Sequence, residues 1–215
     1  MKTTRKLWYY PFLAILFSAV IVSCNDDDED DVPPPPPENE EEVITDVKLV
    51  FTNAEDPGDV VEARAEDPDG EGVDPLMVVD EINLDTSKAY VLAFEILNAL
   101  DADDIEDIGE EIEEEDDEHQ IFFSFSNNAF AIPAGDGNID NASDTVNYLD
   151  EDSEAQDGSG NPVGLSTSWA TSSTQLTGGS FRVRLQHQPD GIKTATSTAD
   201  DGDTDFDLEF ILNIQ

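Results

Sequence analysis

Two histidines are the residues of this chain best suited to bind a metal ion, and they are the only histidines among its 215 residues. His119 begins the apolar segment 119–125 and His187 ends the apolar segment 181–187. Each shares the alternation of its inward-facing neighbours, so we expect both imidazoles to point toward the core at strand ends. With Glu115 and Asp116 they form a ligand set for zinc or a similar divalent ion, unless each is only a hydrogen-bonded rim residue.

Two other ligands, haem and calcium, are suggested by the histidines and the acidic residues of the chain. Two histidines can ligate haem iron axially, and the chain resembles secreted haem-carrying lipoproteins of Bacteroidota in size and histidine count, but its acidity attracts haem propionates poorly. Calcium is suggested by the alternate acids of segments 67–70, 150–152 and 201–205. None of these segments completes an EF-hand loop, so each is a weak calcium signal.

The chain has no motif of a common enzyme class. It contains no GxSxG, no HExxH, no phosphate-binding glycine loop and no cysteine besides Cys24. Carboxylates are so abundant that a glycosidase-like pair cannot be singled out. We therefore expect a binding or structural protein and no enzymatic activity.

The candidate ligands lie on elements with the pattern of a β-protein. Segments 43–51, 90–96, 121–125, 181–185 and 206–214 alternate apolar and polar residues with a period of two. Trp169 marks a buried strand within the Ser/Thr-rich stretch 166–180, and 145–149 has a weaker strand pattern. Turns rich in Gly, Pro and Asp separate them, which predicts a single antiparallel, immunoglobulin-like β-sandwich over residues 43–215.

One short helix is predicted between residues 101 and 118. Ile105, Ile108 and Ile112 have helical spacing, and Asp101 or Asp103 can cap its start. The acids at its C-terminal half oppose the helix dipole there. A bound cation or fraying of the last turn would relieve this repulsion.

The N-terminal 23 residues have the pattern of a secretion signal. Lys2, Arg5 and Lys6 precede an apolar run from Leu7 to Val22, which is shorter than the roughly twenty residues of a membrane-spanning helix. Residues 21–24 resemble the lipobox of bacterial lipoproteins, in which the cysteine is lipidated and becomes the mature N-terminus. The resemblance implies that Cys24 carries the lipid anchor. It also leaves no cysteine for a disulfide.

Residues 24–42 form a predicted stalk. An acidic run after Cys24 resembles the export tag that sends Bacteroidota lipoproteins to the outer face of the outer membrane. Prolines 33–37 and the following acids have little to bury and favour an extended chain. The stalk is therefore expected to hold the domain away from an outer-membrane surface.

The charge of the chain excludes one class of partner. Residues 1–23 hold three basic and no acidic residues, so the remainder has six basic against 52 acidic residues, a formal net charge of −46. This field repels nucleic acid and anionic lipid head groups. It indicates halophilic adaptation, in which hydrated acids keep the protein soluble in salt, or clustered carboxylates that hold cations.

Four segments, 113–123, 161–166, 181–189 and 203–208, together resemble a family of Bacteroidota outer-membrane lipoproteins over residues 43–215. Its members are often called type 1 periplasmic binding fold superfamily proteins. That name implies a two-lobed α/β fold, and this chain departs from it because it is too short and lacks alternating strands and helices. We keep the β-sandwich prediction.

These observations favour a surface-exposed lipoprotein whose sandwich binds a ligand, with a divalent metal, zinc or calcium, the best supported. Its location suggests a TonB-dependent outer-membrane receptor as partner. The alternative is a structural or adhesive surface lipoprotein without a small ligand, in which the acids only confer solubility. A haem-binding lipoprotein is the second alternative.

Overall fold

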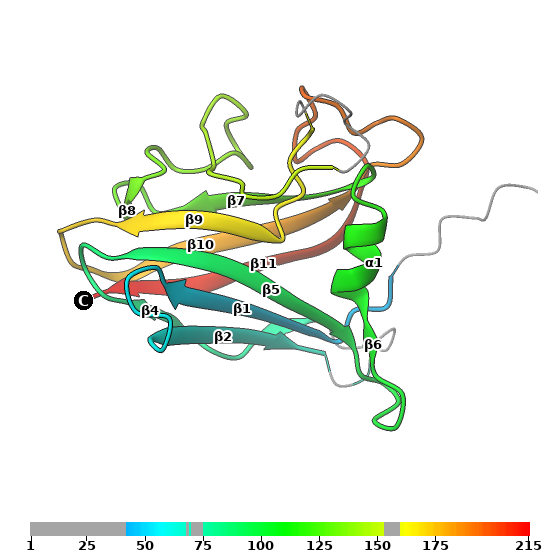
Figure 1. Ribbon diagram of the computed structural model, residues 1–215, viewed down its shortest axis with the longest axis horizontal. Coiled ribbons are helices and arrows are strands. Elements are labelled where there is room, and N and C mark those ends of the chain that lie inside the picture. Colours follow the sequence, from blue (N-terminus) through cyan, green and yellow to red (C-terminus); the bar gives the residue numbers. More distant parts are fainter. Residues whose placement is uncertain (1–41, 68, 70–74, 153–159) are drawn as a thin grey trace, which may run out of the picture. The chain divides into compact units, whose positions relative to one another are not determined.

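The computed structural model describes residues 42–215 except 68, 70–74 and 153–159, and these residues form two packed β-sheets and one helix (Figure 1). Sheet A has seven strands, in the order β3 (Met77–Val78), β2 (Val60–Glu66), β1 (Asp46–Asn53), β5 (Ala89–Asn98), β9 (Ser166–Thr171) and β8 (Phe130–Ile132), with β6 (Glu106–Asp107) paired to β5. Sheet B has four, in the order β4 (Ile82–Leu84), β11 (Asp203–Ile214), β10 (Leu176–His187) and β7 (His119–Phe125).

The predicted mainly β sandwich with one short helix is confirmed. All named strand pairs of the described residues are antiparallel except β4 with β11, which is parallel. The signal and stalk predicted for residues 1–41 lie outside the described residues. Glu42, the last residue of the predicted stalk, is described.

The core forms because the strands alternate as their sequences predict. In β1, Val47, Leu49 and Phe51 are fully buried while their neighbours are partly exposed. The inward residues of β11 in sheet B join the same core. One apolar layer between the two sheets therefore holds the domain together.

An aromatic cluster occupies the centre of this layer. Trp169 of β9 is 1% exposed, as the sequence predicted, and its ring lies against Phe123, Phe125, Phe130 and Phe181 at centroid distances of 4.8–5.4 Å. These rings come from both sheets. The cluster therefore joins sheet A to sheet B.

Helix α1 (Ile108–Glu114) is shorter than predicted, and its cap is a different residue. Asp107 caps it, with Oδ1 accepting from the Glu110 N–H at 3.3 Å. The predicted caps Asp101 and Asp103 are wrong, because Asp107 still pairs with β5 as part of β6 and the helix begins only after it. Ile105 consequently lies outside the helix and is exposed. No helix among the described residues is long and apolar enough to cross a membrane.

The weak strand predicted at 145–149 is also wrong. Its only ladder contact among the described residues is an isolated bridge from Tyr148 to Thr167. The Tyr148 hydroxyl instead donates to the Ile121 carbonyl at 2.8 Å. The main chain of the segment lies beside β9, where the Leu149 N–H donates to the Ser166 carbonyl and the Ser168 N–H to the Asn147 carbonyl, each at 2.9 Å, without forming a regular strand.

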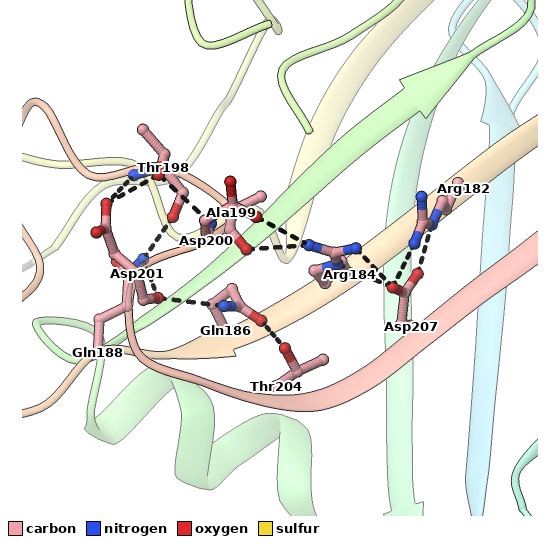
Figure 2. A network of polar contacts seen from close by, with 10 residues as sticks. All are labelled: Arg182, Arg184, Gln186, Gln188, Thr198, Ala199, Asp200, Asp201, Thr204 and Asp207. Atoms are coloured by element: carbon pink, nitrogen blue, oxygen red, sulfur yellow. Dashed lines mark hydrogen bonds and ion pairs between the residues drawn. The ribbon is translucent and has the colours of Figure 1, made fainter. Parts of the chain in front are cut away.

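A loop of residues 188–202 joins β10 to β11 and folds back on the outer face of sheet B (Figure 2). Arg184 donates to the Ala199 carbonyl, and Gln186 and Gln188 both donate to the Asp201 carbonyl, at 3.0–3.1 Å. Inside the loop, the Asp201 carboxylate accepts from the N–H and hydroxyl of Thr198. Arg184 and Gln186 of sheet B, together with Gln188 within the loop, thereby hold residues 199–201 in place.

Candidate metal centre

The two histidines meet at one end of sheet B. His119 is the first residue of β7 and His187 the last of β10, and they are direct partners in the antiparallel register. Their rings stack with centroids 4.2 Å apart and an interplanar angle of 23°. The side chains are 1% and 2% exposed, so the predicted inward orientation is correct. We call these two residues the histidine pair.

Glu42 completes a cluster with the histidine pair. Its Oε1 lies 3.2 Å from Nε2 of His119 and 3.9 Å from Nδ1 of His187. The side chain is 9% exposed, and its Oε2 is buried without a hydrogen-bond partner among the described residues. Sequence analysis placed Glu42 in the stalk, and no feature of the surrounding acids distinguishes it.

The outer nitrogens of both rings are already bonded. Nδ1 of His119 donates to the Glu115 carbonyl at 3.2 Å. Nε2 of His187 donates to Oε2 of Glu118 at 3.3 Å. These two bonds fix the rings so that the remaining nitrogens face the same oxygen of Glu42.

The turn between α1 and β7, residues 115–118, positions these groups. Glu115 caps the C-terminus of α1, and its carbonyl also accepts the N–H groups of Glu118 at 2.9 Å and His119 at 3.2 Å. Figure 1 shows α1 standing beside the end of the sandwich where β7 starts and β10 finishes. The C-terminal end of α1 therefore positions this turn beside the histidine pair.

The two predicted acidic ligands, Glu115 and Asp116, differ in whether they lie near the other candidate ligand atoms. The Glu115 carboxylate is 55% exposed and lies 4.0 Å from Nδ1 of His119, and it forms a second possible ligand group with Glu118 and His187. Asp116 belongs to neither group of clustered ligand atoms in the described part of the chain, and its carbonyl accepts a hydrogen bond from Lys193. Glu118 was not singled out, although it directly precedes His119.

The acids suggested for calcium bond to nearby main chain. Asp150 accepts from the N–H groups of Gly164 and Ser166 at 3.0 and 2.9 Å, and Asp67 accepts from that of Asp69 at 3.1 Å. Asp201 binds within its own loop. In the described residues, none of these segments contributes to a three-ligand group.

The charge distribution favours an ion pair in the absence of metal. Burial opposes protonation of His119, but the hydrogen bond and charge of Glu42, with help from Asp205, outweigh it and raise its pKa above 6.5. Burial likewise opposes ionisation of Glu42, but the hydrogen bond to His119 and the charges of both histidines lower its pKa below 4.5. A proton on His119 Nε2 thus occupies the position a cation would take.

We expect the Glu42–His119 ion pair to stabilise the fold of the metal-free domain most between about pH 4.5 and 6.5. The raised pKa of His119 stabilises the fold fully below 6.5, and this contribution is lost as pH rises through the folded value. The lowered pKa of Glu42 stabilises above 4.5, and its contribution is lost as pH falls through the folded value. Midpoints of thermal unfolding for wild type and Glu42→Gln, measured in chelator across this range, should differ most in that window. A difference that does not vary with pH would contradict this account.

Comparison with protein-family models, characterised proteins and solved structures finds no significant match to this chain. The resemblance to Bacteroidota lipoproteins therefore stays a prediction. The interpretation of the site depends on the geometry described above.

Proposed function

We propose that this domain binds one divalent transition-metal ion, with Zn²⁺ the best fit, through Glu42 Oε1, His119 Nε2 and His187 Nδ1. The observation that carries the proposal is the convergence of one Glu42 oxygen and two imidazole nitrogens, while the outer nitrogen of each ring is bonded to Glu115 or Glu118. The three ligand atoms lie within 4.8 Å of one another. Tetrahedral ligands about 2.1 Å from zinc are about 3.4 Å apart, so the side chains must move closer and the stacked rings must turn to direct both nitrogens at one ion.

The surroundings of the cluster also favour a metal. Histidine ligands of zinc commonly donate their second N–H to a carbonyl or a carboxylate, which are the partners of His119 and His187 here. Glu42 Oε2, which has no hydrogen-bond partner in the part of the chain that the structure describes, is a costly buried atom that bidentate coordination would satisfy. A divalent ion would replace the His119 proton and offset the negative charge that the nearby acids create.

Two imidazoles select against the other ligands considered. Calcium requires six to eight oxygen ligands, whereas imidazole suits zinc, copper, nickel and iron. Haem needs its two axial ligands on opposite faces of the porphyrin. The rings of His119 and His187 stack at 4.2 Å, which leaves no space for a porphyrin between them. The cluster therefore fits neither calcium nor haem.

We further propose that the domain is displayed on an outer-membrane surface by a lipid on Cys24, and that it delivers its metal to a TonB-dependent receptor. The apolar run before Cys24 and the acids after it support the anchor. The location alone supports the receptor. The competing function is a structural or adhesive lipoprotein, in which the Glu42–His119 ion pair only stabilises the fold.

The test is calorimetric titration of Zn²⁺ into purified protein stripped of metal, with elemental analysis before stripping. We expect one zinc per chain. His187→Ala removes a ligand, so its affinity should fall by more than the about 10- to 100-fold that loss of an outer partner costs. Glu118→Gln keeps an acceptor oxygen but removes the charge of the outer partner, and its affinity should fall within that range.

Glu113→Gln is the matched control, since Glu113 is an exposed carboxylate of α1 and its loss changes the charge equally. It should bind zinc as wild type does. Calcium should give no heat that depends on His187. If wild type binds none of these ions, the metal proposal is wrong and the structural or adhesive function is left.

A further inference from the structure

A buried lysine lies beneath the turn that carries the candidate ligands. Lys193, in the loop of residues 188–202, is 6% exposed. Its Nζ donates to the carbonyl of Asp116 and, at 2.7 Å, to that of His119. These two carbonyls stand on either side of Glu118. The ammonium therefore holds both ends of the segment from which Glu118 and His119 project.

Burying the charged ammonium of Lys193 inside the protein costs free energy. Burial lowers the pKa of Lys193 to about 8, although Asp152, Asp116, Asp150 and Asp117 act in the opposite direction. Among the described residues its hydrogen bonds go to main-chain carbonyls and not to a carboxylate. A buried charge used to bond two carbonyls of one turn fixes the shape of that turn.

The loop also connects to the second ligand strand. Gln188 directly follows His187, and its N–H donates to the Glu118 carbonyl at 2.6 Å. The N–H of Lys193 donates to the Gln188 carbonyl at 3.1 Å. One short segment, 188–193, thus continues directly from His187 at the end of β10 and bonds to the turn before His119 at the start of β7.

The polar network of Figure 2 bonds the far half of the loop to sheet B. The Arg184 guanidinium spans from Asp207 to the Ala199 carbonyl. The buried amide of Gln188 donates to the carbonyls of Thr198 and Asp201. Lys193 therefore reaches the turn from a loop that is hydrogen-bonded at Gln188, where it leaves β10, and again at residues 198–201.

We infer that Lys193 is a positioning residue of the metal centre, and that it holds His119 and Glu118 at the separation from His187 that metal coordination requires. The inference rests on the proposed function. Lys193 contacts no ligand atom, so it acts through the backbone of the turn. Ligands must be held closely for tight and selective binding, and the shell behind them supplies that restraint.

The test compares Zn²⁺ affinity in wild type and Lys193→Met, at a temperature where circular dichroism shows both metal-free proteins to be folded. Methionine keeps the unbranched apolar stem but leaves two carbonyls unbonded. We expect the dissociation constant to rise about 10- to 100-fold. The visible absorption of the Co²⁺-substituted site should also shift, since this spectrum reports ligand geometry and not fold stability.

Lys88→Met is the matched control. Its side chain is 36% exposed, and its ammonium pairs with Glu55 at 3.8 Å. It should keep wild-type affinity and spectrum. If Lys193→Met lowers only the midpoint of thermal unfolding and leaves affinity and spectrum unchanged, the inference is wrong. Absence of zinc binding in wild type would overturn the proposed function itself, which distinguishes the two failures.

A milder pair of variants covers the case in which Lys193→Met does not fold. Arg184→Met frees the loop at Ala199, whereas Arg182→Met removes only bonds to Asp207 in the described network (Figure 2). We expect a smaller loss of zinc affinity for Arg184→Met and none for Arg182→Met. Equal affinities in both variants would contradict the role of the loop.

Discussion

Replacing Trp169 by alanine is expected to lower the free energy of unfolding by about 3–5 kcal/mol, the range for removing a large aromatic side chain from a core. Trp169 is 1% exposed and its ring touches four phenylalanines from the two sheets. Its indole N–H also donates to the Thr167 hydroxyl at 2.8 Å. The substitution would leave a cavity where the sheets meet. Urea unfolding followed by circular dichroism measures the change.

Ile211→Ala provides the comparison for Trp169→Ala. Ile211 lies on β11 but is 48% exposed, so it should cost no more than about 0.5 kcal/mol. If Trp169→Ala cost less than about 1 kcal/mol, the tight packing described for the aromatic cluster would be incorrect.

Replacing Cys24 by serine is expected to move nearly all of the protein from the membrane pellet to the soluble fraction. Cys24 lies outside the described residues, and the prediction follows from its sequence context. A serine hydroxyl cannot take the thioether-linked diacylglyceryl group. Acyl chains contribute about 0.8 kcal/mol per buried methylene, so their loss removes the anchor completely. Ultracentrifugation of lysed cells and immunoblotting give the distribution.

Ser23→Ala keeps a small residue before the cysteine and is the control for Cys24→Ser. It should sediment with membranes as the wild type does. Sedimentation of Cys24→Ser to the same extent would show that another part of the chain holds the protein to the membrane.

The fold was largely predictable because its signal is local. Val47, Leu49 and Phe51 recur every second residue, and this period is the geometry of a strand with one buried side. The same rule predicted inward orientation for His119 and His187. It could not predict that they are neighbours, because parity gives a side chain its face but not the partner of its strand.

Other parts of the site have no local signal. Glu42 resembles the acids before it, and only the tertiary path of the chain brings it to the histidine pair. Lys193 lies in a turn-rich stretch where a lysine is usually solvated. The cap of α1 moved to Asp107 because pairing with β5 outweighs the helical spacing of Ile105.

The position of β11 in sheet B affects how the protein can be made. β11 is the last strand in the sequence, yet it lies between β4 and β10. While the ribosome is still synthesising the chain, β1 can pair with β2 and with β5, but β4 lacks its one paired strand among the described residues until β11 emerges. Sheet B therefore gains its full set of strands only after β11 has been synthesised.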